Sequence, residues 1–357
     1  MNAQLIGLAL RRTLTPTFAL AAAAILAAAT QLRWAPEQLW NGGGATHVPG
    51  WARQGLWTIG ALTLLPVLVH KAASTIPRWR AGEVDWLAKS PANRGGILLS
   101  TWCGAALAAA VVVAMIALAA ELAARSSEPA LRLVSRLPAP NGALIDDDAH
   151  LNWSVGARAA RGGDLLRVGV VMIASQPSAD VVVSALRRAG DGTVRRNDTH
   201  AHVVAACELE VAVPAGDGAL ELELKREQPG AIVALDGGGV AWLTPIESAR
   251  TISVDLAVNM WLATVAWLGL ALGCGAWVSP LLALLTLLCV SLFSWIGAST
   301  VLDAWWPWGA VPDALDLSSR GISAGPPTIP RVLGALACVA LGLLLARIDV
   351  ATWRRNA

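Results

Sequence analysis

The chain has 357 residues, of which 55% are hydrophobic and only 15% are charged, against roughly 25% charged residues in an ordinary soluble domain. This composition excludes a disordered chain and argues against a wholly soluble protein. The formal net charge is +2, and no concentrated basic patch of the kind that binds nucleic acid stands out, so nucleic acid is not an expected partner.

The charged residues are concentrated in one part of the chain. Residues 122–252 hold 13 Arg and Lys and 16 Asp and Glu, which makes 29 of the 52 charges in 131 of the 357 residues. We therefore expect one water-exposed domain, residues 122–252, inserted between two membrane-embedded parts, residues 1–121 and 253–357.

Six apolar runs are long enough to cross a bilayer, which takes about 20 helical residues. They are Leu14–Leu32, Leu56–Thr75, Ile97–Leu122, Val254–Val278, Pro280–Ala298 and Val332–Ile348. Pro66 predicts a kink in the second run, and the short break around Ser279 predicts a tight helical hairpin. The first run also fits a cleaved signal peptide, although its length favours a retained span.

Basic residues in the short loops predict the orientation, because such loops stay in the cytoplasm when they are rich in Lys and Arg. They precede the first run, separate the second from the third, and follow the sixth: Arg11, Arg12, Lys71, Arg78, Arg80, Lys89, Arg94, Arg347, Arg354 and Arg355. Both termini should therefore be cytoplasmic and residues 122–252 extracytoplasmic, in a multi-pass protein of the cell (inner) membrane.

The inserted domain is expected to be rich in β-strands. Strand-like runs of Val, Leu or alternating residues occupy Leu165–Ala174, Asp180–Leu186, His202–Val213 and Ala219–Lys225. Turn signals lie at Gly190–Gly192, Pro214–Gly218 and Asp236–Gly239. Short strands at such spacing favour an antiparallel β-sandwich, so the predicted fold is an α-helical polytopic membrane protein with six transmembrane helices and an inserted β-sandwich-like domain.

The chain contains 17 Trp and no Tyr. Trp is typical of the membrane–water boundary, where its ring is half buried and its N–H stays hydrated. Boundary anchoring is therefore expected for the Trp residues around the two predicted outer loops, with an aromatic ligand platform as the alternative: Trp34, Trp40, Trp51, Trp57, Trp305, Trp306 and Trp308.

The cytoplasmic segment Pro77–Arg94 is predicted to form a short amphipathic helix. Trp79, Glu83 and Trp86 share one side at helical spacing, and Pro91 disfavours helix at the residue before it. Such a helix has two uses, an anchor lying among the lipid headgroups or a lever that receives force from a soluble partner. The residue pattern alone leaves the two open.

This segment resembles the permeases of the ABC type-2 transporter family. Those subunits carry an acidic stretch, then L-x-x-[SQ]-P-x-x-R, then [IV]-L-L-x-x-x-x-G at the start of the third span. The matching residues here are Glu83, Leu87, Ser90, Pro91, Arg94, Leu98, Leu99 and Gly104, with Trp86 beside Leu87. The Pro in span two, the large outer insert and the run Gly269–Gly273 are similar to permeases associated with multicopper-enzyme maturation.

The resemblance implies a coupling helix that docks on a cytoplasmic ABC ATPase subunit through Glu83, Trp86, Leu87, Ser90, Pro91 and Arg94. It also implies a homodimer or a pair with a second permease. The chain itself has only three Lys, and none lies in the G-x-x-x-x-G-K-[ST] loop that cradles phosphate. We therefore expect ATP to be hydrolysed by a separate ATPase subunit. In addition, no catalytic, cofactor-binding or metal-binding residues are expected in this chain. The alternative is a membrane-anchored extracytoplasmic binding or sensory protein without transport.

Several weaker signals receive structural interpretations. Gly321–Gly325 matches the G-x-S-x-G motif but lacks the strand and helix that a nucleophile elbow requires. His200 and His202 alternate on a likely strand and are expected to be surface residues rather than metal ligands. Glu121 and Asp255, at outer span ends, are expected to be hydrated boundary residues.

Two stripes of small residues predict close helix packing in lipid. One holds Gly269 and Gly273, and the other holds Gly334, Cys338 and Gly342. Packing within one chain is the expected use, with a dimer face as the alternative.

Overall fold

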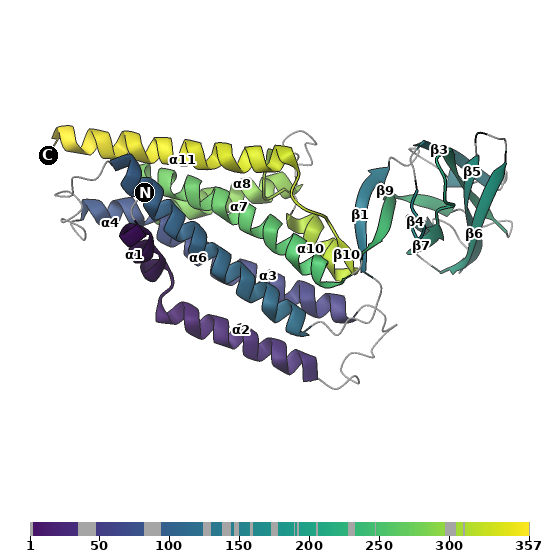
Figure 1. Cartoon of the computed structure of the whole chain (residues 1–357), viewed down its shortest axis with the longest axis horizontal. Helices are drawn as coiled ribbons and strands as arrows, with labels where there is room; N and C mark the ends of the chain where they lie inside the picture. Colours follow the sequence, from purple (N-terminus) through teal and green to yellow (C-terminus); the bar gives the residue numbers. More distant parts are fainter. Residues whose placement is uncertain are drawn as a thin grey trace. The chain divides into compact units, whose positions relative to one another are not determined.

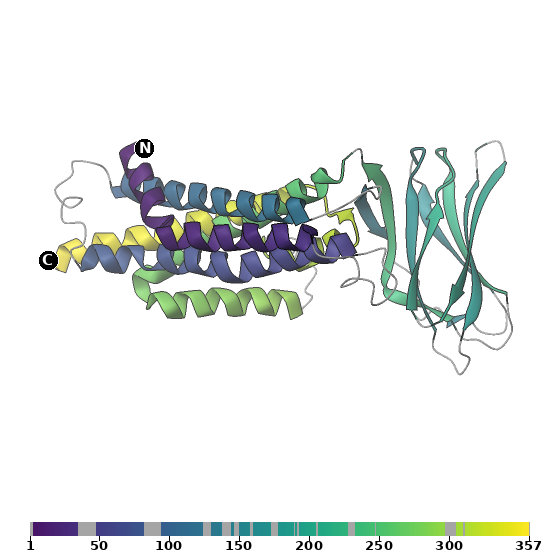
Figure 2. The same cartoon turned by 90° about the horizontal axis from the view of Figure 1, so that it is seen from below.

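The computed structural model describes residues 3–34, 48–81, 94–123, 130–137, 144–145, 150–157, 160–172, 178–188, 190, 193–204, 206–227, 233–246, 248–296, 305–309 and 311–356. The chain divides into two compact units, one made of Met1–Glu128 with Ala249–Ala357 and the other of Pro129–Ser248. The first unit is helical and the second is rich in β-sheet (Figures 1 and 2).

The helical unit follows the predicted apolar runs closely. Its elements are α1 (Ala3–Thr13), α2 (Pro16–Trp34), α3 (Val48–Ala73), α4 (Thr75–Arg80), α6 (Arg94–Ala123), α7 (Arg250–Trp277), α8 (Pro280–Ile296), α10 (Val311–Ser319), the short strand β10 (Ile322–Ser323) and α11 (Ile329–Asn356). Four stretches are long and apolar enough to cross a membrane: Arg53–Arg80, Gly95–Ala123, Arg250–Trp277 and Ile329–Ile348. They correspond to the second, third, fourth and sixth predicted spans.

The helices α2 and α8 coincide with the first and fifth predicted runs. The helix α8 contains a shorter apolar stretch, Pro280–Leu292, and it begins three residues after α7 ends at Trp277, as the predicted hairpin requires. Pro66 lies inside α3. Sequence reasoning missed α1 and α10.

The helix α7 is the centre of the helical unit, in contact with α3, α6, α8 and α11. The stripe Gly269–Gly273 meets Gly342 of the second stripe at the contact of α7 with α11, whereas Gly334 lies against the Trp305 carbonyl oxygen. A Cβ atom added to Gly273 would lie 2.5 Å from the Gly342 carbonyl oxygen, and one added to Gly342 would lie 1.9 Å from the Gly269 carbonyl oxygen. The prediction of packing within one chain is therefore confirmed for Gly269, Gly273 and Gly342. The helices α7 and α11 that carry them are in extensive contact and are labelled in Figure 1.

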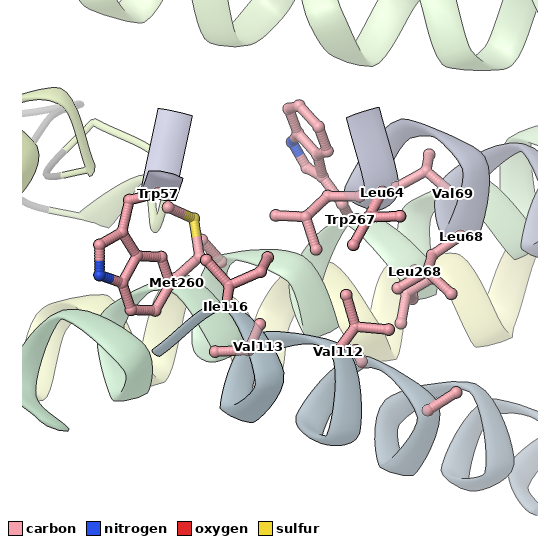
Figure 3. Close-up of a cluster of buried hydrophobic side chains, with 14 of the residues drawn as sticks. Trp57, Leu64, Leu68, Val69, Val112, Val113, Ile116, Met260, Trp267 and Leu268 are labelled. Atoms are coloured by element: carbon pink, nitrogen blue, oxygen red, sulfur yellow. The ribbon is translucent and has the colours of Figure 1, made fainter. Parts of the chain in front are cut away.

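A layer of apolar side chains from α3, α6 and α7 fills the interior (Figure 3). Trp57 of α3 belongs to this layer and is fully buried, so the prediction that Trp57 anchors at the membrane boundary was wrong. Trp308 stacks on Trp267 of α7 with the ring centroids 4.0 Å apart, and its indole N–H donates to the Ala263 carbonyl oxygen at 2.9 Å. An indole can fill an interior gap as readily as it sits at the boundary, because most of its surface is apolar.

The sheet-rich unit contains antiparallel strands in two sheets. One has the order β1-β9-β4-β7 with β2 beside β9, and the other has the order β3-β8-β5-β6. The strands are β1 (Ala130–Leu137), β2 (Leu144–Ile145), β3 (His150–Ala157), β4 (Leu165–Met172), β5 (Ala179–Arg188), β6 (Val194–Val203), β7 (Ala206–Ala212), β8 (Ala219–Arg226) and β9 (Val233–Ile246).

Both sheets contribute to one hydrophobic core. Alternate residues of β4, β5 and β8 point into it, including Val168, Val183 and Leu222, all fully buried. The alternation of Leu with charged residues in β8 therefore places Leu inward, as expected for a strand with one wet face.

Two sequence predictions in this unit were wrong. The run His202–Val213 is two strands, because β6 ends at Val203 and β7 begins at Ala206. The predicted turn Asp236–Gly239 lies inside β9, where the pairing with β4 jumps from Val168↔Val240 to Val170↔Leu235. These residues form an irregularity within the strand, and glycine is the residue that tolerates such a bulge.

Candidate functional site

The predicted coupling helix falls mostly outside the described residues. Glu83, Trp86, Leu87, Ser90 and Pro91 belong to residues 82–93, which the structure does not describe. Arg94 is the first residue of α6, and its side chain is also not described. The described part of this region consists of the two helices that flank it, α4 before and α6 after.

The helix α4 is joined to α3 by a turn that side chains stabilise. Ser74 Oγ and Thr75 Oγ1 both donate to the Lys71 carbonyl oxygen, at 2.9 and 3.1 Å. The Arg78 N–H donates to the Ser74 carbonyl oxygen. Hydroxyl side chains commonly satisfy backbone groups in this way where one helix ends and another begins.

The helix α4 is also fixed to the rest of the helical unit. Ile76 is 1% exposed and packs in a cluster with Leu98 of α6, with two α7 residues and with one α11 residue: Leu272, Ala276 and Ala346. Arg80 Nη2 donates to the Ala276 carbonyl oxygen at 2.7 Å. The helix α4, which precedes residues 82–93, is therefore bound to α7. The helix α6, which follows them, contributes Leu98 to the same cluster.

A basic pocket lies beside α4, between α1, α3 and α6. Its volume is about 80 Å³, and it is lined by three cations and by apolar and Thr side chains: Leu5, Leu8, Ala9, Arg12, Thr13, Leu68, Lys71, Ala72, Thr75, Arg78, Trp79, Thr101 and Ala105. The Lys71 ammonium donates to the Thr13 carbonyl oxygen at 2.9 Å and to Thr15 Oγ1 at 3.1 Å. It lies 4.9 Å from the centre of the Phe18 ring, within cation–π range.

A polar cluster ties α3, α6 and α7 together elsewhere in the helical unit. Ser253 Oγ donates to Glu121 Oε1, and Arg53 Nη2 lies 3.6 Å from the same oxygen. Arg53 is only 2% exposed. Glu121 is thus held by α3 and α7 rather than simply hydrated.

The G-x-S-x-G motif belongs to a second buried polar cluster. Ser323 Oγ donates to Asp255 Oδ2 and accepts the Gly325 N–H at 3.0 Å. Asn259 Nδ2 donates to the Gly325 carbonyl oxygen at 2.9 Å. Asp255 is 8% exposed, so its prediction as a hydrated boundary residue was wrong. Through these hydrogen bonds Ser323 connects the segment that precedes α11 to Asp255 of α7.

The wet face of the β5–β6–β8 sheet carries contacts between histidines and carboxylates. His202 Nδ1 lies 2.7 Å from Asp180 Oδ1, and His200 Nδ1 lies 3.3 Å from Glu227 Oε1. Both histidines are exposed, as predicted. Among the described residues, no group of three or more His, Cys, Asp or Glu is arranged to hold a metal ion. These are contacts between polar side chains at a solvated surface, where such pairs add little stability.

Four helices are long and apolar enough to cross a membrane, and a second unit is rich in β-sheet; this combination is compatible with a multi-pass membrane protein. No family model and no curated protein matches the chain. Among solved structures, the CBM22-1 xylan-binding domain from Paenibacillus barcinonensis Xyn10C is similar to 34% of this chain over 99% of its own length, with 11% identity and a TM-score of 0.22. That likeness is too weak to assign a fold or a ligand here.

Proposed function

We propose that the chain is the membrane-spanning permease subunit of an ATP-driven transporter of the ABC type-2 class, and that a separate cytoplasmic ABC ATPase subunit hydrolyses the ATP. The observation that carries the proposal is the run from Glu83 to Gly104, whose spacing matches the coupling element of that family. The run follows Lys71, Arg78 and Arg80 and itself contains Lys89 and Arg94, and such a concentration of basic residues predicts a cytoplasmic location.

The attachment of α4 supports a mechanical use of residues 82–93. A lever transmits force only if its ends are joined to the parts that must move. Ile76 on the entry side and Leu98 on the exit side pack in one cluster with α7 and α11. A push on residues 82–93 by a closing ATPase dimer would therefore be delivered to four helices at once, and would open or close a path between permease subunits.

In this proposal α2 and α8 also cross the bilayer, which makes six spans. Their 19 and 17 residues correspond to about 28 and 26 Å of helix at 1.5 Å per residue, close to the roughly 30 Å of the hydrocarbon core. Both termini would be cytoplasmic, and the sheet-rich unit would be an extracytoplasmic β-sandwich in a protein of the inner membrane. Two copies, or one copy and a second permease, would form the pathway.

Co-purification from membranes tests the proposal. The tagged wild-type chain should bring down a Walker-A ATPase, and the double variant Glu83→Ala/Arg94→Ala should lose it while keeping its melting temperature. The variant Arg355→Ala, which removes a charge predicted to be cytoplasmic but outside the coupling motif, should keep the partner. Equal recovery of the ATPase with the double variant, or cysteine labelling that places residue 85 on the outer side, contradicts the proposal.

The second candidate is a membrane-anchored binding or sensory protein, and it is favoured by the separate hydrophobic core of the sheet-rich unit. A deletion of residues 129–248 distinguishes the two. A permease that lacks the sheet-rich unit should still co-purify with its ATPase. A sensory protein should not co-purify with an ATPase whether or not the unit is present, and the deletion should abolish its ligand binding.

A further inference from the structure

The pocket between α1, α3, α4 and α6 concentrates positive charge around a small cavity. Arg12, Lys71 and Arg78 come from three different helices, and none of the described residues that line the pocket is acidic. Lys71 and Arg78 are close enough to repel one another electrostatically. Bringing like charges together costs free energy, and a bound anion would remove that cost.

The Lys71 ammonium is held in place for such a role. Its bonds to Thr13 and Thr15 use two of its three N–H donors. Both acceptors are neutral, so these bonds position the ammonium at the junction of α1 and α2 without cancelling its charge. Arg12, next to Thr13, and Arg78, one residue before Trp79, are exposed and can approach an anion from the open side.

The volume of the pocket and the residues that line it indicate which class of ligand it can bind. About 80 Å³ has room for several water molecules, and hence for a tetrahedral phosphate group. Leu5, Leu8 and Trp79 add apolar surface beside the cations. A basic pocket among helices long enough to cross a membrane, with apolar side chains beside its cations, suits a lipid whose phosphate meets the cations while its glycerol and first methylenes meet the apolar residues.

We propose that this pocket binds the phosphate group of an anionic membrane phospholipid. The bound phosphate bridges α1 through Arg12, α3 through Lys71 and α4 through Arg78. Since α4 directly precedes residues 82–93, the bound lipid stabilises the position of α4 and so of the start of that segment. The inference concerns a site separate from the coupling motif and does not depend on an ATPase partner.

Binding of defined lipids to the purified full-length chain in detergent tests the proposal. Native mass spectrometry would count and titrate bound phosphatidylglycerol, with phosphatidylcholine and inorganic phosphate as the other two arms. We expect phosphatidylglycerol to bind preferentially. The variants Arg12→Gln and Arg78→Gln should each weaken this binding roughly fivefold, as expected for about 1 kcal/mol per basic residue near a lipid surface.

The matched control is Arg11→Gln. It removes the same charge from the neighbouring position on α1, but Arg11 does not line the pocket, so its effect should stay below about twofold. Lys71→Met should weaken binding most, and melting temperatures would show whether it also unfolds the α1–α2 junction. If Lys71→Met unfolds this junction, the proposal is judged from the phosphatidylglycerol binding of Arg12→Gln and Arg78→Gln.

The possible outcomes distinguish a lipid phosphate group from free inorganic phosphate as the ligand. Inorganic phosphate that displaces phosphatidylglycerol completely at millimolar concentration would assign the pocket to a soluble phosphate and overturn its assignment to lipid. Equal losses in Arg11→Gln and Arg12→Gln would show general surface attraction and overturn the site altogether. Equal binding of phosphatidylcholine and phosphatidylglycerol would overturn it as well.

Discussion

At the scale of single residues, Arg187 is a buried cation of the sheet-rich unit. It is 1% exposed, and its guanidinium nitrogens have no hydrogen-bond partner among the described residues. Burial lowers the pKa of Arg187, while the nearby carboxylates of Asp217 and Asp164 oppose that effect. The Arg187 charge is therefore compensated at longer range by carboxylates, of which Asp164 is itself buried.

Replacing Arg187 with Met should destabilise the sheet-rich unit by about 2 kcal/mol, because the Asp164 carboxylate would stay buried without its counter-charge. Denaturant unfolding of the full-length chain would measure the loss. The double variant Arg187→Met/Asp164→Asn should recover part of it, which is the signature of coupling in a double-mutant cycle. Arg188→Met, at the exposed neighbouring position, should change stability by less than about 0.5 kcal/mol.

Ser323 allows a second prediction at this scale, because its motif and its surroundings indicate different roles. Ser323→Ala removes the hydroxyl that donates to Asp255 and accepts from the Gly325 N–H, and it should lower the free energy of unfolding by about 1–3 kcal/mol. The wild-type serine should not react with a fluorophosphonate probe, since Ser323 is fully buried. Thr63→Val, which removes an exposed hydroxyl bonded within its own helix, is the matched control. Covalent labelling of Ser323 would contradict the structural role.

At the scale of elements, the contact between α7 and α11 depends on glycine. A Cβ at position 273 would meet backbone atoms of Gly342, and backbone cannot rotate out of the way as a side chain can. Gly273→Ala should therefore force the helices apart and lower stability by about 1–3 kcal/mol, although Ala alone favours a helix by about 1 kcal/mol over Gly. Gly55→Ala in α3, where no atom lies within 4 Å of the added Cβ, should be neutral or stabilising. Thermal unfolding in detergent would compare them.

The same elements show what the sequence could reveal. The positions of α3, α6, α7 and α11 follow from apolar length alone, because only a helix satisfies its backbone in lipid. The stripes at Gly269–Gly273 and Gly334–Gly342 indicated close packing, but which helices would meet depends on the three-dimensional fold. Trp57 was mispredicted because composition does not reveal which side of a helix faces its neighbours. The coupling motif was readable as a family pattern, whereas the basic pocket joins cations up to 66 positions apart in sequence, from Arg12 to Arg78, and had no local signal.

At the scale of the whole molecule, the two compact units have separate hydrophobic cores. The core of the sheet-rich unit draws on β4 to β9, and that of the helical unit draws on its long apolar helices and their connections. Among the described residues of Pro129–Ser248, only Val194 and Val204 are large apolar side chains with high exposure. A unit with its own core and a mostly polar surface satisfies the physical requirements for folding alone.

Residues 129–248, expressed without the helices, should therefore be soluble and should melt in one cooperative transition with a strand-rich circular dichroism spectrum. Leu222→Asp supplies the matched test of the core, because Leu222 of β8 is fully buried in that core and an unpaired carboxylate there costs several kcal/mol. That variant should lose the transition, whereas Glu221→Asp on the wet face should keep it. A fragment that aggregates or melts without cooperativity would mean that the strands need the helical unit to fold, even though their core does not include it.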